Sequence, residues 1–159
     1  MPTHAEQRVL PYRPQQLFDL VAAIDRYPEF LPWCVGARIK ERHENIVLAD
    51  LVIGFKLFRE KFTSRVTLDE ANMRIDVEYM DGPFRYLNNH WQFKPHPTGC
   101  EIDFFVDFEF RSKILQKTIG MLFNEAVTRM ISAFEGRAKE LYGDSTVGDV
   151  AGTEQPFSR

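Results

Sequence analysis

Four carboxylates close together in the sequence are the most obvious candidates for acid/base chemistry. Glu101, Asp103, Asp107 and Glu109 lie two or four residues apart, and a pair of carboxylates can act as general acid and general base. They alternate with apolar side chains, so a β-strand over residues 101–110 would carry the charges on one face and the apolar groups on the other. This alternation favours a solvent-facing row over a catalytic pair, because charges on a wet face also keep a protein in solution.

His90 is the best placed for chemistry of the four histidines, because it lies within a run that alternates like a strand. Its face also carries Tyr86, Asn88 and Gln92, a polar set that favours a solvated outer position over a catalytic one. The sequence contains no nucleophile elbow, P-loop, dinucleotide fingerprint or metal-binding helix motif. We therefore predict a non-catalytic protein with no metal site and no resident cofactor.

Asn89 differs from these residues because it falls on the apolar face, between Leu87 and Trp91. A buried amide must find hydrogen-bond partners. Asn89 therefore either pairs within a packed core or marks a polar spot in a cavity.

The charge balance gives no general attraction to nucleic acid, because the net charge is -3 and the isoelectric point is near 5.8. We expect no binding to DNA. Six basic residues nevertheless gather on the middle strands, namely Lys56, Arg59, Lys61, Arg65, Arg85 and Lys94. They fit a solvated, charge-paired surface, or a surface for a phosphate-rich partner such as ribosomal RNA or an anionic membrane.

The elements that position these residues follow from the period of the apolar pattern. Between residues 35 and 110 the period is two, which is typical of an antiparallel meander with one wet face. Turn residues interrupt the pattern at 44–45, 81–83 and 98–99. A short strand at residues 8–12 precedes the meander and brings the total to about seven. After it, Pro14 opens a helix with one apolar face, although Arg13 is a poor capping residue.

Residues 113–142 repeat apolar side chains every three or four positions, which predicts one long amphipathic helix. Ser112 can cap its start and Gly143 can end it. At 1.5 Å per residue this helix runs about 45 Å, enough to cross a whole sheet. The polar, aperiodic residues 144–159 predict a disordered tail, so the domain is expected to span residues 1–143.

The expected architecture is a single α+β domain, a curved antiparallel sheet wrapped around the long C-terminal helix. A helix alone cannot fill the concave face of a strongly twisted sheet, so side chains or a ligand must fill the rest. The chain contains 14 Phe, and such rings line apolar pockets as well as cores. A ligand would contact the inner faces of the strands and helix through Phe62, Val66, Trp91, Phe93, Phe104, Phe108, Phe123, Val127 and Met130.

Residues 27–34, Tyr-Pro-Glu-Phe-Leu-Pro-Trp-Cys, join the first helix to the sheet. The two prolines permit about one helical turn and fix the path of the chain. Phe30, Leu31 and Trp33 could then simply complete the core. Alternatively, Pro32 and Trp33 form the rim of a cavity, where the flat Trp33 ring offers a surface for stacking.

The same segment resembles the signature of the coenzyme Q-binding START-domain family, and further runs agree with it in order over residues 5–143. These runs are Phe62-Thr63-Ser64-Arg65-Val66, Gly82-Pro83-Phe84 with Leu87 and Trp91, Phe108-Glu109-Phe110 before Ser112, and Met130-Ile131-Ser132-Ala133-Phe134-Glu135 with Arg137-Ala138 and Tyr142-Gly143. The family is placed in the polyketide cyclase/dehydrase superfamily. Its bacterial relatives include a protein described as a ribosome association toxin.

The resemblance implies a helix-grip (START/Bet v1-like) fold with an apolar tunnel for ubiquinone or a similar polyprenyl lipid, carried in support of respiration or quinone biosynthesis. The alternative that it implies is a toxin that binds the large ribosomal subunit and blocks subunit joining. A third role, aromatic polyketide cyclisation, needs an acid or base inside the cavity, where Asn89 is the one candidate polar group. Residues 1–7 are polar and leave no room for a transit sequence, and no run approaches 18 apolar residues. We therefore expect a bacterial, cytoplasmic protein with weak, reversible membrane contact.

Overall fold

The computed structural model describes residues 3–55 and 58–143, without the side chains of residues 55, 58 and 119–124. Within these residues the chain forms one seven-stranded antiparallel sheet in the order β1-β7-β6-β5-β4-β3-β2. The strands are β1 (Thr3–Leu10), β2 (Cys34–His43), β3 (Ile46–Phe55), β4 (Phe58–Asp69), β5 (Arg74–Asp81), β6 (Phe84–His96) and β7 (Gly99–Phe110). The helices are α1 (Pro14–Ala22), the short 3-10 helices η1 (Ile24–Glu29) and η2 (Glu70–Asn72), and α2 (Lys113–Tyr142).

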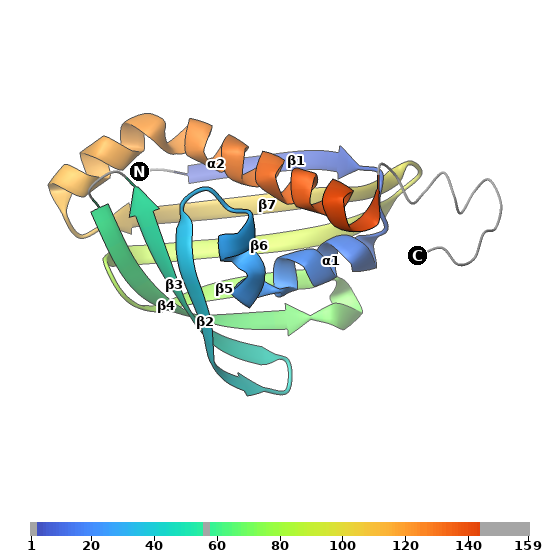
Figure 1. Ribbon diagram of the computed structural model, residues 1–159, viewed down its shortest axis with the longest axis horizontal. Coiled ribbons are helices and arrows are strands. Elements are labelled where there is room, and N and C mark those ends of the chain that lie inside the picture. The colour runs from blue at the N-terminus through green and yellow to red at the C-terminus, as the bar shows by residue number, and fades with distance from the viewer. Residues whose placement is uncertain (1–2, 56–57, 144–159) are drawn as a thin grey trace.

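The sheet is strongly curved, and the helices α1, η1 and α2 lie on the same side of it (Figure 1). Strands β2 to β4 cross the view steeply, whereas β1, β6 and β7 run along its length. The predicted fold class, with seven antiparallel strands and a long C-terminal helix, is confirmed. None of the helices in the described part of the chain is long and apolar enough to cross a bilayer.

The ends of α2 are formed as the sequence predicts. The Ser112 hydroxyl accepts a hydrogen bond from the Leu115 N–H at 3.1 Å, which satisfies one free donor of the first turn. Gly143 follows the last helical residue with a φ of 89°, a conformation that glycine adopts without strain. The predicted tail, residues 144–159, lies outside the described residues.

The first strand is longer than predicted and begins earlier, at Thr3 instead of Arg8. It pairs with β7 from Thr3 opposite Asp107 to Leu10 opposite Cys100. The strand lies at the edge of the sheet and its residues alternate between exposed and half-buried, so its sequence carries little apolar signal. Tyr12 lies beyond the strand, and its hydroxyl donates to the Gly143 carbonyl at 2.7 Å.

Gly99 begins β7 at a very close contact with the end of the neighbouring strand β1. Its φ is 146°, a conformation that L side chains rarely adopt. A Cβ atom placed on Gly99 would lie 2.0 Å from the carbonyl oxygen of Leu10. The chain therefore needs glycine here both for its backbone conformation and for the approach of β1 to β7.

Candidate functional site

A cavity of about 480 Å³ lies between the concave face of the sheet and α2. Strands β3 to β7 line it with every second residue, because alternate side chains of a strand point to the same face. On β3, for example, Ala49, Leu51 and Ile53 face the cavity. Pockets that hold a drug-sized ligand measure about 300–1,000 Å³, so this one is large enough for a small apolar molecule.

Aromatic residues around Phe84 form one wall of the cavity. The Phe84 ring lies 5.3 Å from Phe62, 5.4 Å from Tyr79, 5.5 Å from Phe108 and 4.7 Å from Phe110, between ring centroids. Three of these contacts are edge-on, a geometry that contributes about 0.5–1.5 kcal/mol per pair beyond the buried area. This packing can hold the wall in place without a ligand.

A second aromatic cluster, around Phe134 of α2, joins the helix to the sheet. Phe134 contacts Trp91 of β6 at 5.2 Å, Tyr27 of η1 at 5.4 Å and Phe30 at 5.2 Å. Trp91 in turn meets Phe104 at 4.6 Å. These contacts fix the position of α2 above the sheet and so determine the height of the cavity.

The structure brings most of the predicted site residues together. Those that line the cavity are Pro32, Trp33, Phe62, Val66, Asn89, Trp91, Phe104, Phe108, Val127 and Met130. The side chain of Phe123 lies outside the described residues.

Phe93 does not line the cavity, although it shares the inner face of β6 with Trp91. It is 1% exposed and packs edge-on against Phe18 of α1 at 5.9 Å. Strand alternation identifies the face of the sheet but not the part of that face which α1 covers. Phe93 belongs to the core beneath α1.

The exposed residues of the lining are Pro32, on the connection from η1 to β2, and Glu125 and Arg129, on α2, so the cavity opens between these two segments. Pro32 is exposed and Trp33 is half-buried at this opening. This position fits a role of Trp33 at the rim of the cavity better than a role in completing the core. On α2, Glu125 and Arg129 also border the cavity and form an ion pair at 3.1 Å. Sequence reasoning missed this pair, because charges one helical turn apart are ordinary on a solvated helix face.

Asn89 and Ser64 bring polar atoms to the apolar lining. The Asn89 amide nitrogen donates to the Phe105 carbonyl at 2.8 Å, so Asn89 is both paired within the sheet and part of the cavity wall. Ser64 is 3% exposed, and its hydroxyl has no hydrogen-bond partner among the described residues. One weak signal in the sequence points to Ser64, because it is a polar residue between Phe62 and Val66 on an apolar face.

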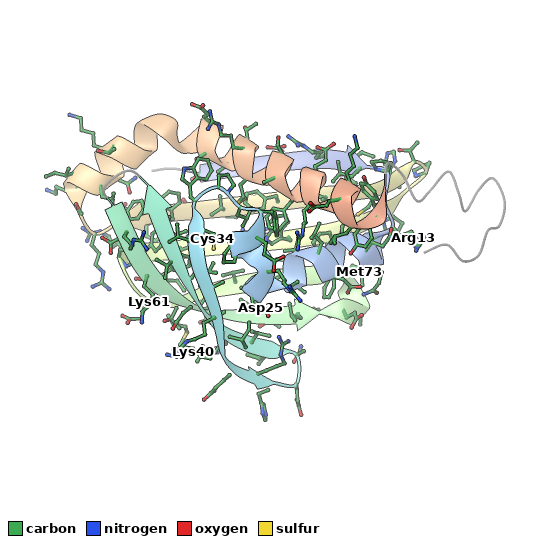
Figure 2. All side chains as sticks on the ribbon, in the orientation of Figure 1. Arg13, Asp25, Cys34, Lys40, Lys61 and Met73 are labelled. Atoms are coloured by element: carbon green, nitrogen blue, oxygen red, sulfur yellow. The ribbon has the colours of Figure 1, made fainter. Side chains whose placement is uncertain are left out.

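Two further lining residues carry ionisable groups. Burial raises the pKa of the Cys34 thiol, which donates to the Gly36 carbonyl at 3.4 Å. Burial also raises the pKa of Tyr27 well above its usual range, and its hydroxyl donates to the Val21 carbonyl. Both groups keep their protons at neutral pH, so neither is an activated nucleophile or base. Figure 2 shows Cys34 at the start of β2, next to η1.

The charged residues that were weighed for catalysis lie on the other face of the sheet. Asp103 pairs with Lys94 at 2.6 Å, and Glu109 pairs with Arg85 at 2.9 Å. These two carboxylates thus belong to a charge-paired outer surface.

His90 stacks on Phe105 on this outer face, with ring centroids 5.2 Å apart. Burial and the nearby Arg74 lower the pKa of His90. No group of three or more His, Cys, Asp or Glu residues within the described ranges is arranged to hold a metal ion.

Among the basic residues, Arg65 pairs with Glu78 at 3.4 Å. Lys94 and Arg85 also pair with carboxylates, so three of the six predicted basic residues are neutralised in this way. Lys56 lies outside the described residues.

Relatives of known name are similar over most of the chain. The ribosome association toxin RatA of Rickettsia prowazekii is 48% identical over 84% of this chain and 94% of the relative. The mitochondrial coenzyme Q-binding protein COQ10 homolog B of Xenopus laevis is 30% identical over 91% of this chain and 61% of the relative.

Solved structures agree with the fold. An 18 kDa protein of Caulobacter crescentus is 38% identical and superimposes with a TM-score of 0.75, over 90% of this chain and 99% of the other. A START superfamily protein of Mycobacterium smegmatis, at 17% identity, shares the fold with a TM-score of 0.76 over 87% of this chain and 98% of the other. A family model described as polyketide cyclase / dehydrase and lipid transport matches residues 10–135. With this match and these relatives, the chain belongs to that START-like family.

Proposed function

We propose that the protein binds an apolar ligand of the prenylated quinone class in its cavity and acts as a carrier without catalysing a reaction. The observation that carries the proposal is an apolar cavity of about 480 Å³ between sheet and helix. Affinity would come mainly from burying isoprenoid surface, at roughly 25 cal/mol per Å². The relative named as a coenzyme Q-binding protein supports this ligand class.

The two tryptophans of the chain provide the test, because Trp33 and Trp91 both line the cavity. Titration with decylubiquinone should quench their fluorescence in a saturable manner. Mass spectrometry of the purified protein should find a co-purified prenylated lipid. A protein that shows neither quenching nor bound lipid would contradict the proposal.

Trp33→Ala is expected to weaken decylubiquinone binding about tenfold and to leave stability nearly unchanged. The ring is half-buried at the opening, so its loss removes a stacking surface worth up to about 1.5 kcal/mol. Calorimetric titration and thermal unfolding measure the two effects. Val35→Ala is the matched control, since Val35 is 45% exposed nearby on β2. A stability loss of about 3–5 kcal/mol in Trp33→Ala would show instead that the ring completes the core.

Peripheral membrane contact follows from the same proposal, because so apolar a ligand would be collected at a bilayer. Binding to vesicles should be weak and reversible. Flotation of the protein with phosphatidylcholine vesicles, with and without anionic lipid, measures it. Tight association that resists salt would contradict a reversible contact.

Ribosome association is the second candidate function, and it is the one that the name of the relative from Rickettsia prowazekii states. Lys40, Arg42 and Lys61 are exposed and form no ion pair within the described residues. Figure 2 shows Lys40 and Lys61 in the region of β2 and β4, away from α2. Lys40 and Lys61 also lie near enough to Asp50 to help lower its pKa. Exposed cations of this kind suit contact with ribosomal RNA phosphates.

Cosedimentation with isolated large ribosomal subunits tests this candidate. The triple variant Lys40→Glu, Arg42→Glu, Lys61→Glu should lose binding, and binding of the unmodified protein should fall steeply with salt. The control is the charge-matched variant Arg65→Glu, Arg85→Glu, Lys94→Glu, whose cations are already paired. Equal binding by both variants would exclude this surface.

A further inference from the structure

The first turn of α2 presents an apolar side chain to the solvent among basic residues. Ile114 is 75% exposed, more than any other large apolar side chain in the described part of the chain. Lys113 precedes it, Lys117 lies about one helical turn later, and Arg111 comes just before the helix; all three are exposed. The inward side of this turn is already occupied, because Leu115 is buried and lines the cavity. Ile114 therefore adds little to the core, and its side chain is available to a partner outside the protein.

The charge of this segment is opposite to that of the whole chain. Residues 111–124 carry three cations and no carboxylate, whereas the net charge of the chain is -3. Arg111, Lys113 and Lys117 form no ion pair within the described residues. Cations are also unfavourable at the positive end of a helix dipole, and the first turn of α2 contains no acidic residue to offset them. This arrangement does not stabilise the helix, and it suits a negatively charged partner.

The same side of α2 leads to the opening of the cavity. Ile114, Lys117 and Glu125 lie on one side of the helix, because three and eleven residues are close to one and three full turns. Glu125 and Arg129 border the opening, and Glu125 lies about 16 Å along the helix from Ile114. Figure 1 shows the first turns of α2 at the end of the molecule opposite to α1. A flat surface that contacts Ile114 and Lys117 therefore also faces the side of α2 on which the cavity opens.

We infer that Arg111, Lys113, Ile114 and Lys117 form the surface by which the protein docks on an anionic bilayer. The Ile114 side chain enters the membrane interface, and the three cations contact lipid phosphates. RNA phosphates would suit the cations equally well, but they offer nothing to an exposed isoleucine, so the combination favours a membrane. This inference rests on the proposed function, which requires a ligand to be collected at a bilayer, and it adds the contact surface and the orientation of the protein.

Two variants test the inference by flotation with vesicles of phosphatidylcholine and phosphatidylglycerol in equal amounts. Lys113→Gln with Lys117→Gln should lower the partition coefficient roughly tenfold to thirtyfold, at about fivefold for each cation. Ile114→Ala should lower it about threefold to tenfold, because less apolar surface enters the interface. Both variants should bind decylubiquinone like the unmodified protein, since none of these residues lines the cavity. The melting temperature of the double variant should stay the same or rise slightly, because two cations leave the positive end of the helix dipole.

Each variant has a matched control. Leu141→Ala removes a 51% exposed apolar side chain from the other end of α2, and Lys40→Gln with Arg42→Gln removes two exposed cations from β2. Both controls should float like the unmodified protein, and losses equal to those of the test variants would overturn the inference.

The remaining outcomes separate the inference from the proposed function and from RNA binding. If Ile114→Ala floats normally and the double lysine variant loses cosedimentation with large ribosomal subunits, the surface binds RNA and the inference is wrong. If the unmodified protein binds decylubiquinone but no vesicles, the inference fails alone. If the test variants lose flotation and the unmodified protein binds no quinone, the docking surface stands and the proposed ligand class fails.

Discussion

Ala49→Phe is expected to reduce decylubiquinone affinity about tenfold to hundredfold while the protein stays folded. Ala49 is 1% exposed on β3 and faces the cavity, so a phenyl ring at this position occupies space that the ligand needs. The ligand loses about as much buried area as a phenylalanine side chain provides, worth roughly 1.5–3 kcal/mol. Aromatic residues are well tolerated in strands, but Ala49 is already closely covered by its neighbours. The larger ring should therefore lower the stability by about 1–3 kcal/mol without unfolding the protein.

Leu48→Phe provides the control, since Leu48 is the preceding residue and faces the outer side of β3. It should bind decylubiquinone like the unmodified protein. Ala49→Phe should also keep its cosedimentation with large ribosomal subunits if the outer cations mediate that contact. Unchanged ligand affinity in Ala49→Phe would show that the cavity between sheet and helix is not the binding site.

Gly99→Ala is expected to destabilise the protein by about 3–5 kcal/mol, a fall of roughly 10 °C or more in melting temperature. Its φ of 146° is strained for alanine, and the new Cβ would meet the Leu10 carbonyl oxygen at 2.0 Å. Relief requires that β1 move away from β7, which breaks the edge of the sheet. Thermal and urea unfolding measure the loss.

Gly136→Ala is the control for this substitution. Gly136 lies within α2, where a Cβ atom would meet nothing within 4 Å. Alanine stabilises a helix interior by about 0.5–1 kcal/mol relative to glycine, so this variant should melt slightly higher. Similar losses in both variants would mean that the contact between Gly99 and Leu10 is not the cause.

The sequence was most informative where side chains alternate on strands with one wet face. Phe104 and Phe108 of β7 were placed correctly because Asp103 and Asp107 mark the opposite face. Phe93 shows the limit of that rule. It obeys the alternation but lies beneath α1, and no local pattern encodes which part of a sheet a helix covers.

The polar groups of the cavity were harder to predict. Ser64 is chemically ordinary, and the lack of a partner for its buried hydroxyl among the described residues depends on residues far away in the sequence. Glu125 and Arg129 likewise read as an exposed helical ion pair, and only the position of α2 above the opening brings them to the cavity. Helix amphipathicity predicts which residues of a helix are buried, but it does not predict which polar residues beside this apolar stripe lie at a cavity.

The pairing of β1 with β7 also limits when the sheet can fold during translation. Thr3 and Asp107, which face each other across these strands, are 104 residues apart. At a translation rate of about 5–20 residues per second, roughly 5–20 s pass between the synthesis of Thr3 and that of its partner Asp107. During this time β1 cannot form its pairing with β7. Contacts between such distant segments slow folding. A ribosome that stalls before Gly99 therefore holds a nascent chain whose apolar inner face is uncovered, and this chain is a substrate for chaperones until β7 and α2 emerge.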